Sequence, residues 1–480
     1  MDTHQNFIGG AWRPASSGAS YVIRNPAQPS EVLGEFADAT AADAGEAVTA
    51  AAAAASDWAG TPGPTRGALL LRLAQLIVDD ADQLARVVTL EQGKALAESK
   101  GEVLRAATEL RYMAGEASRP TGQSYPSERS GVTCTTTAEP IGVVAAICPW
   151  NFPIVTPVRK LAPALAWGNT VVLKPSSATP WSAVRLAQLA ERAGFPAGVL
   201  NVITGAGVTG GEALVGDPRV AGISFTGSTA TCIRIYGLAA SRLARVQLEL
   251  GGKNPAVVVD HDDLDAAARE IVAAAFLCSG QRCTALSRVI VTHAAADALV
   301  SCILQYVDRI VVGDGLAAGT TMGPLVSERH LQSVDKYVQE ARAAGVELLR
   351  GGGPAADGTG SGYFYQPTVF DHVDPASALA REEVFGPVLP ILRVGDLEEA
   401  IAVANETKYG LAASVFTSRM QVANEFATRV AAGMIHVNHG TASQAHVPFG
   451  GVKASGQGAY SIGPTAREFF TNVKAVYIRW

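Results

Sequence analysis

The sequence has 480 residues, of which 48% are hydrophobic and 17% are charged, and its formal net charge at pH 7 is −6. This composition is typical of a folded chain with a sizeable core, and it excludes a disordered or fibrous protein. Because the chain has no long basic run, we expect neither a nucleic-acid partner nor an anionic membrane partner.

The N-terminus and the cysteines bear on where the protein works. Residues 1–5 lack the charged and apolar regions of a signal peptide, and no apolar run is long enough for a membrane span. The six cysteines are scattered and form no Cys-x-x-Cys pair. The sequence therefore predicts no metal site and no disulfide framework, and a reducing cytoplasm fits best.

The first part of the chain combines helices with short apolar strands. An alanine-rich run over 41–55 predicts a helix, since alanine is the strongest helix former, and apolar spacing predicts helices over 69–90 and 181–193. Alternation of strands and helices indicates a parallel, doubly wound sheet, the Rossmann-like design of dinucleotide-binding domains. Buried strands are predicted at 141–147, 170–173, 199–203 and 222–225.

A second alternating series starts near residue 255 and predicts a second α/β domain. Its strands are predicted at 255–259, 288–291 and 434–437. The threonine-rich segment 131–137 and the chain end 473–478 fit neither domain, and both are predicted to be exposed strands.

Cys283 ends the segment 280–283 and is a candidate nucleophile. A cysteine attacks only as a thiolate, and we expect the neighbouring Arg282 and a nearby helix start to lower its pKa. For a lone cysteine, however, a buried structural role is the more common case. Glu249 stands between a predicted strand and two glycines, where a carboxylate can face a cleft and act as a general base; the alternative is a surface acid beside a turn.

Asn151 and Ser228 each follow a predicted strand. Asn151 can donate an amide N–H to a developing oxyanion, although a proline-bounded turn is the alternative. At the start of a helix, Gly227 permits close approach and Ser228 can bond a phosphate; the alternative is an ordinary serine N-cap. No Gly-x-Gly-x-x-Gly follows the first strand, so the standard dinucleotide fingerprint is absent.

Taken together, these segments resemble the aldehyde dehydrogenase superfamily over nearly the whole chain. The motifs that carry the resemblance, in the family's order, are 149–153, 174–176, 225–229, 249–255, 280–283, 382–387 and 448–451. The resemblance implies an α/β fold with a Rossmann-like cofactor domain, a second α/β catalytic domain and a small β oligomerisation arm. It places the NAD(P)-binding domain at 1–121 and 141–250, the catalytic domain at 251–452, and the oligomerisation segments at 122–140 and 460–480.

By matching position, the resemblance implies that Cys283 is the nucleophile, that Glu249 activates water, and that Asn151 and the Cys283 backbone N–H form the oxyanion hole. Lys160 matches a structural lysine near the site. The cofactor, NADP or NAD, is expected to contact a larger set of residues. That set is Trp150, Lys174, Ser176, Ser177, Gly207, Gly211, Phe225, Gly227, Ser228, Leu250, Glu383 and Phe385.

The implied reaction has two stages. Thiolate attack gives a tetrahedral hemithioacetal, whose oxyanion each donor stabilises by about 2.7–4 kcal/mol at most. Hydride transfer to the nicotinamide then gives a thioester, which water activated by Glu249 hydrolyses.

Three positions depart from the family's pattern: Cys232 replaces a glycine, Tyr460 lies where an acidic relay is common, and Ser177 replaces the glutamate of NAD-preferring relatives. A glutamate there would repel a 2′-phosphate, so we expect NADP to be accepted.

Within the family, the resemblance is closest to succinate- and 2-oxoglutarate-semialdehyde dehydrogenases. Arg159 and Ser443 match their carboxylate-binding residues, while Leu277 replaces their second arginine, for which Arg282 can compensate. The implied substrate is a semialdehyde or another small anionic aldehyde. Neutral, hydroxylated, sulfonated or aromatic aldehydes remain the alternative, because Arg159 can equally form a salt bridge within the fold.

Two rival functions remain. The segment 280–283 also resembles that of CoA-acylating semialdehyde dehydrogenases. Such enzymes tend to lack the water-activating glutamate, which is present here as Glu249. A non-catalytic structural protein on this fold is disfavoured by the presence of both Cys283 and Glu249. Because exposed strand edges invite pairing between chains, we expect a homodimer or homotetramer.

Overall fold

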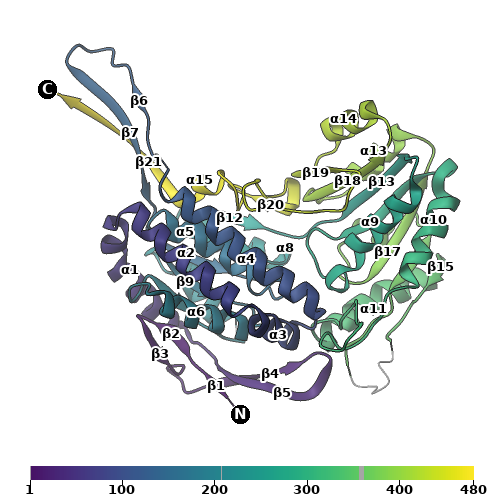
Figure 1. Ribbon diagram of the computed structural model, residues 1–480, viewed down its shortest axis with the longest axis horizontal. Helices are drawn as coiled ribbons and strands as arrows, with labels where there is room; N and C mark the ends of the chain where they lie inside the picture. The colour runs from purple at the N-terminus through teal and green to yellow at the C-terminus, as the bar shows by residue number, and fades with distance from the viewer. Residues whose placement is uncertain (1, 120, 207, 356–361) are drawn as a thin grey trace.

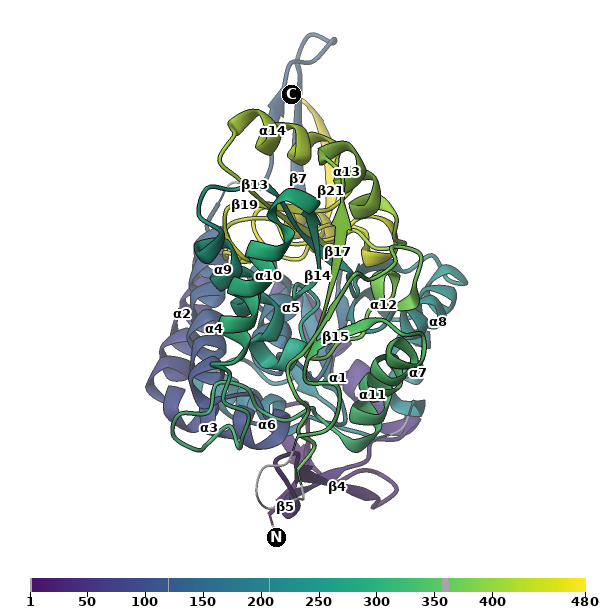
Figure 2. The same ribbon diagram turned by 90° about the vertical axis from the view of Figure 1, so that its right-hand side faces the viewer.

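The structure is a computed structural model that describes residues 2–119, 121–206, 208–355 and 362–480. In Figure 1 the elements of the N-terminal half lie on the left, a second group of strands and helices lies on the right, and a long arm projects at the upper left. Figure 2 shows the arm and the N-terminal strands at opposite ends of the molecule. Among the described residues, no helix combines the length and apolar character that a membrane crossing requires.

The first large sheet has the strand order β20-β12-β11-β8-β9-β10-β2-β3. Strands β8 to β12 run parallel, whereas β20 and β2 pair antiparallel with the outer members of that group. The carboxyl ends of β8, β11 and β12 therefore lie at one edge of the sheet. The strands are β2 (Asn6–Ile8), β3 (Ala11–Arg13), β8 (Val143–Ile147), β9 (Thr170–Lys174), β10 (Leu200–Val202), β11 (Val220–Thr226), β12 (Arg245–Glu249) and β20 (Gly456–Gln457).

Helices cover both faces of this sheet, which explains why its strands are apolar throughout. Alternate residues of β8 show the two faces: Val144 and Ala146 pack with α2 to α6, and Val143 and Ala145 pack with α1, α7 and α8. The helices are α1 (Ala41–Gly60), α2 (Gly63–Asp79), α3 (Ala81–Gln92), α4 (Leu96–Glu116), α5 (Val155–Ala166), α6 (Trp181–Ala193), α7 (Thr209–Gly216) and α8 (Thr229–Ala240).

The segment 69–90, predicted from its helical spacing, is helical except at Asp80, where the chain breaks between α2 and α3. Asp80 has φ −100° and ψ 12°, outside the helical range. Buried residues on both sides, such as Ile77 and Leu84, pack into the same core cluster. The apolar spacing therefore continues across the break and hides it.

The second large sheet has the strand order β15-β16-β17-β14-β13-β18-β19, with β15 antiparallel to the parallel remainder. Helices α9 and α10 pack on one face and α11 to α14 on the other. The elements are β13 (Asn254–Asp260), α9 (Leu264–Phe276), the 3-10 helix η1 (Leu277–Gly280), β14 (Leu286–Thr292), α10 (His293–Val307), α11 (Glu328–Ala343), β15 (Glu347–Arg350), β16 (Thr368–Asp371), α12 (Ala378–Arg381), β17 (Val388–Val394), α13 (Leu397–Asn405), β18 (Ala412–Thr417), α14 (Met420–Arg429) and β19 (Met434–Val437).

The arm is a small antiparallel sheet of order β21-β7-β6. Strands β7 and β21 contain the two segments predicted as exposed strands, and β6 is an additional strand. Val473 and Tyr477 on β21 are 75% and 74% exposed, and Trp480 is 87% exposed. The remaining elements are β1 (Thr3–His4), β4 (Ser20–Asn25), β5 (Gln28–Ala37), β6 (Ser124–Tyr125), β7 (Val132–Pro140), η2 (Lys453–Ser455), α15 (Ala466–Phe470) and β21 (Thr471–Arg479).

The predicted α/β class with two such sheets and a β arm is therefore observed. One strand falls outside the predicted domain ranges: β20 lies between residues 452 and 460 and joins the first sheet through β12. The domain boundaries themselves stay a prediction.

Candidate active site

A cavity of about 550 Å³ is lined by the carboxyl ends of β8, β11 and β12, by helices α4 and α5, and by the loop after η1. The two large sheets thus both contribute to it, as expected for a site built at strand ends. The predicted residues that line it are Trp150, Asn151, Arg159, Lys160, Gly227, Ser228, Glu249, Leu250, Arg282, Cys283, Glu383, Phe385 and Ser443.

Some predicted cofactor residues lie elsewhere. Phe225, Lys174, Ser176, Ser177 and Gly211 do not line this cavity. Phe225 is buried in the core beneath α7 and α8, because it precedes the last residue of β11. Gly207 lies outside the described residues.

The loop that carries Cys283 is fixed by two asparagine side chains. Asn254 donates from Nδ2 to the carbonyl oxygens of Cys283 at 2.7 Å and Ala285 at 2.8 Å. Asn151 donates from Nδ2 to the Gln281 carbonyl at 2.8 Å. The loop therefore depends on residues from two other motifs, 149–153 and 249–255, which brings the nucleophile, base and amide candidates together.

The expectation of a lowered Cys283 pKa is wrong in this structure. Burial raises the pKa of Cys283 to about 11, and the nearby Arg159 and Arg282 guanidinium groups only partly oppose it. The expected helix start is also missing, because the loop after η1 leads into strand β14. Desolvation of the thiolate thus outweighs the flanking arginine on which the expectation rested.

Glu249 ends β12 and is buried, and its Oε2 has no hydrogen-bond partner. Burial raises the pKa of Glu249 to about 8, while Lys160, Arg159 and the Ser461 hydroxyl act in the opposite direction. A carboxyl group with a raised pKa that lines a cavity is suited to accept a proton.

Lys160 lies on α5 and is 1% exposed. Its Nζ donates to Ser224 Oγ at 2.9 Å, and that hydroxyl donates to Gln247 Oε1 at 2.8 Å. Burial lowers the pKa of Lys160, with Cys148 and Glu249 opposing the shift. Its position near Glu249 makes it an electrostatic neighbour of the candidate base.

The turn that carries Asn151 is held by a buried ion pair that sequence reasoning missed. Lys94 Nζ lies 2.7 Å from Glu102 Oε2, and both side chains are fully buried. Lys94 also donates to the Asn151 carbonyl oxygen at 2.6 Å, and Glu102 Oε1 accepts from the backbone N–H groups of Ile154 and Val155 at 2.8 and 3.1 Å. We call these two residues the Lys94–Glu102 clamp, because Lys94 bonds to the backbone at the start of the turn and Glu102 bonds to the backbone at its end.

Ser228 caps helix α8, and its Oγ accepts from the Thr231 N–H at 3.3 Å. The cavity also holds an aromatic pair: Trp150 and Phe385 meet edge to face at a centroid distance of 5.4 Å. His330 fixes Phe385 through a 2.8 Å contact between its Nε2 and the Phe385 carbonyl.

Glu383 lies beside the glycine turn of β12. Its Oε1 accepts from the Gly252 N–H at 3.0 Å, and burial raises the pKa of Glu383 to about 7. A Cβ added at Gly251 would lie 1.9 Å from Glu383 Oε2. The turn must therefore be glycine for this carboxylate to reach the cavity.

Arg159 and Ser443, the candidate substrate residues, contact one another. Arg159 Nη2 donates to Ser443 Oγ at 3.2 Å. Arg159 also donates to both oxygens of Glu109, at 3.0 to 3.2 Å, and lies 4.6 Å from the centre of the Phe449 ring. Arg105, on α4, donates to the same serine. Arg159 thus forms a salt bridge within the fold and also lines the cavity.

The chain matches the model of the aldehyde dehydrogenase family over residues 12–476. It belongs to that family. It is 39% identical over 481 residues to an alpha-ketoglutaric semialdehyde dehydrogenase of Bacillus subtilis (strain 168), covering 100% of this chain and 99% of the relative. It is 42% identical over 489 residues to a phenylacetaldehyde dehydrogenase of Pseudomonas fluorescens, covering 99% and 96%.

Among solved structures, an E. coli NADP-dependent enzyme superposes with a TM-score of 0.97 at 36% identity, covering 100% of this chain and 98% of the other. The predicted fold and the prediction of an aldehyde dehydrogenase that uses NAD or NADP are confirmed.

This aldehyde dehydrogenase has Tyr460 where an acidic relay residue is common in the family. The neighbouring Ser461 is the residue that interacts with Glu249. Ser461 follows the 448–451 motif closely, and its hydroxyl lowers the pKa of Glu249 as a hydrogen-bond partner. From the sequence, only the preceding residue, Tyr460, was considered at the relay position. The unusual Cys232 lies on α8 and is buried in the core between that helix and the first sheet.

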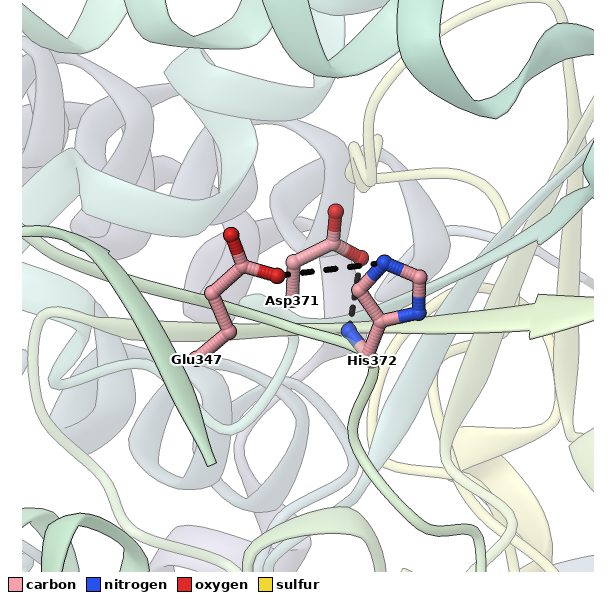
Figure 3. Close-up of side chains that lie close together, drawn as sticks. All are labelled: Glu347, Asp371 and His372. Atoms are coloured by element: carbon pink, nitrogen blue, oxygen red, sulfur yellow. Dashed lines mark hydrogen bonds and ion pairs between the residues drawn. The ribbon is translucent and has the colours of Figure 1, made fainter. Parts of the chain in front are cut away.

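A separate cluster of potential metal ligands, Glu347, Asp371 and His372, lies at the edge of the second sheet of this aldehyde dehydrogenase. Figure 3 shows the Glu347 carboxylate and the His372 ring pointing toward one another, 3.8 Å apart. Asp371, however, is bound by Arg393 Nη2 at 2.7 Å and Nε at 3.2 Å. Because a guanidinium already neutralises the one buried carboxylate, the cluster gives no ground for a metal site.

Proposed function

We propose that this chain oxidises a small aldehyde with a distal anion, such as a semialdehyde, to the carboxylic acid through a thioester on Cys283. The observation that carries the proposal is that Cys283, Glu249 and Asn151 line one cavity together with Arg159 and Ser443. The B. subtilis relative supports it, since its substrate is an aldehyde of this class.

In the first half-reaction, the Cys283 thiolate attacks the aldehyde carbon. Asn151 Nδ2 carries two hydrogens, of which one is used by the Gln281 carbonyl. The second hydrogen and the Cys283 backbone N–H are the donors proposed for the oxyanion. Arg159 lowers the pKa of the Cys283 thiol, so it also favours the reactive thiolate.

In the second half-reaction, Glu249 accepts a proton from the water that attacks the thioester. Its unpartnered Oε2 is free to accept that proton, and its raised pKa makes the carboxylate a stronger base than an exposed glutamate. Ser461 and Lys160 act on the proton affinity of Glu249 without contacting the substrate.

The residues present fit a dinucleotide cofactor. Gly227 and Ser228 stand at the start of the 12-residue helix α8, whose free N–H groups suit a pyrophosphate. Glu383 keeps Oε2 available for a ribose hydroxyl, since only Oε1 is bonded to Gly252. Trp150, Leu250 and Phe385 would hold the nicotinamide end of the cofactor, which would supply the hydride acceptor for oxidation of the substrate carbon.

We assign the adenosine end of the cofactor to Lys174, Ser176, Ser177 and Gly211. Lys174 Nζ donates to the Gly205 carbonyl at 3.3 Å, and a Cβ on Gly211 would lie 3.4 Å from Lys174 Cδ. Because Ser177 brings no negative charge, we propose that NADP is accepted. Catalytic efficiency with NADP and NAD at one salt concentration tests this, and a strong preference for NAD would contradict it.

We also propose that the arm pairs with a second copy, giving a homodimer or homotetramer, and that the enzyme works in the cytoplasm. The apolar side chains on β21 support the assembly, since Val473 and Tyr477 are mostly exposed in the single chain. Sedimentation at micromolar concentration tests it, and a monomer would contradict it.

A second candidate function has one observation in its favour. Arg159 already has a carboxylate partner in Glu109, which suits a purely structural role and a neutral or aromatic substrate. The two candidates differ in an aldehyde panel that pairs succinate semialdehyde with butanal. Arg159→Leu should lower kcat/KM for both aldehydes, because the Cys283 thiolate loses a neighbouring positive charge, and it should lower kcat/KM further for succinate semialdehyde. An equal loss with both substrates would remove the main support for an anionic substrate.

A further inference from the structure

Arg105 is a cavity residue that no family motif singles out. It lies on α4, and its Nη2 donates to Ser443 Oγ, the same atom that accepts from Arg159 Nη2 at 3.2 Å. Its Nε also lies 3.3 Å from Glu109 Oε1, which Arg159 approaches at 3.0 Å. We call Arg105, Arg159, Glu109 and Ser443 the guanidinium cluster.

The guanidinium cluster carries an excess positive charge. It contains two guanidinium groups and one carboxylate, and the side chains of Arg159 and Glu109 are only 13% and 3% exposed. Burial lowers the pKa of Arg105, and the neighbouring positive charge of Arg159 lowers it further. The Arg105 side chain is 33% exposed, so its charge is only partly desolvated, and an anion that enters the cavity would offset the cost of that partial desolvation.

The other cations of the cavity have partners of their own. Lys94 is paired with Glu102 at 2.7 Å, and Lys160 is bonded to Ser224 and lies near Glu249. Arg282 donates weakly to the Thr441 carbonyl at 3.4 Å and lies near Glu98. Arg105 and Arg159 are therefore the two guanidinium groups of the cavity that share a single carboxylate, Glu109.

Ser443 completes the arrangement. Its Oγ accepts from both guanidinium groups, so its own hydroxyl hydrogen remains available as a donor. Nε and Nη2 of Arg159 already donate to Glu109, so a substrate carboxylate would be bound by the remaining guanidinium N–H groups and by this hydroxyl. Such charge-assisted hydrogen bonds to a carboxylate are stronger than neutral ones.

We propose that Arg105 is a specificity-determining residue that, together with Arg159 and Ser443, binds the distal carboxylate of the substrate. The inference rests on the proposed function, in which the substrate carries that anion. Arg105 then supplies, from helix α4, the second positive charge that Leu277 cannot supply from the loop before Cys283. Glu109 acts as a positioning residue that holds both guanidinium groups against the cavity.

The test compares two aldehydes of equal length, succinate semialdehyde and butanal, in the parent enzyme and in Arg105→Leu. The ratio of kcat/KM for succinate semialdehyde to that for butanal should fall about tenfold to a hundredfold, the range for one charge-assisted hydrogen bond. Arg105→Lys keeps the charge without the fork, so its ratio should lie between those of the parent and Arg105→Leu. Arg111→Leu is the matched control, because Arg111 is exposed on the same helix, and its ratio should stay at the parent value.

A second measurement removes the chemistry. Succinate lacks the aldehyde but keeps the distal carboxylate, so its competitive inhibition constant should rise about tenfold or more in Arg105→Leu. If Arg105→Leu does not fold, Arg105→Gln takes its place in both measurements.

The outcomes distinguish a failure of the role proposed for Arg105 from a failure of the proposed function. If the ratio and the inhibition constant stay unchanged in Arg105→Leu while Arg159→Leu lowers the ratio, the role of Arg105 is overturned and the proposed function stands. If the parent enzyme itself does not prefer succinate semialdehyde over butanal, the proposed anionic substrate fails, and the role of Arg105 fails with it.

Discussion

The two parts of the cavity are built in different ways. The proposed reactive centre, Cys283, Glu249 and Asn151, lies on strand ends and loops that are joined by bonds to backbone carbonyls, such as Asn254 to Cys283 and Asn151 to Gln281. The guanidinium cluster is instead assembled from side chains of α4, α5 and the loop at Ser443. Substitutions in the guanidinium cluster can therefore change the substrate while the backbone that supports the chemistry stays in place.

The largest effect is expected at the nucleophile. Cys283→Ala should lower kcat by at least about 10⁴-fold with both succinate semialdehyde and butanal, because no thioester can form. Cofactor binding, followed by fluorescence quenching, should persist, since Cys283 contributes no assigned cofactor contact. Turnover above one per cent of the parent value, roughly a 10²-fold loss, would contradict the assignment.

Asn151→Ala should reduce kcat by about 10²–10³-fold, the usual loss for one oxyanion donor. The reduction should be the same for both aldehydes, because the oxyanion forms at the aldehyde carbon and not at the distal anion. Steady-state kinetics with the two substrates measures this. A loss confined to succinate semialdehyde would indicate that Asn151 binds the distal carboxylate and not the oxyanion.

Breaking the Lys94–Glu102 clamp should act on the reactive centre alone. Lys94→Met releases the Asn151 carbonyl and leaves Glu102 without its partner, so kcat should fall about tenfold to a hundredfold with both aldehydes. Lys100→Met is the control, since Lys100 forms only an exposed ion pair with Asp82. A change in the ratio between the two aldehydes would show that the clamp also sets selectivity.

The effect of pH is graded and acts on the second half-reaction only. Glu249 must be ionised to act as a base, and its pKa is raised to about 8 by burial. The rate of thioester hydrolysis should therefore rise about tenfold per pH unit below that value and level off above it. Single-turnover hydrolysis across the neutral range measures the profile, and Glu249→Gln should flatten it. An equal rise in the variant would assign the titration to another group.

Much of the fold follows from local patterns. Helix α6 coincides with the segment predicted from apolar spacing, because its amphipathic face packs on the first sheet. The split between α2 and α3 did not show, since Ile77 and Leu84 keep the same apolar phase across Asp80. Local spacing reports which face is buried, and it does not report a backbone break that preserves that face.

The candidate site divides in the same way. Cys283, Glu249 and Asn151 could be proposed from the sequence because each stands in a short motif that resembles the family's pattern. Arg105 could not, because it meets Ser443 across 338 positions of sequence and lies on an ordinary helix. The raised pKa of Cys283 could not be predicted either, because it results from burial, which only the folded chain shows. The sequence shows only the flanking Arg282, which acts in the opposite direction.

The most direct test of the central claim is to trap the acyl-enzyme. Glu249→Gln, mixed with succinate semialdehyde and NADP or NAD, should release one equivalent of reduced cofactor per active site and then turn over slowly. Mass spectrometry of the quenched protein should find the succinyl group on the peptide that contains Cys283. A burst without acylation of Cys283, or steady turnover at the parent rate, would contradict a thioester that Glu249 hydrolyses.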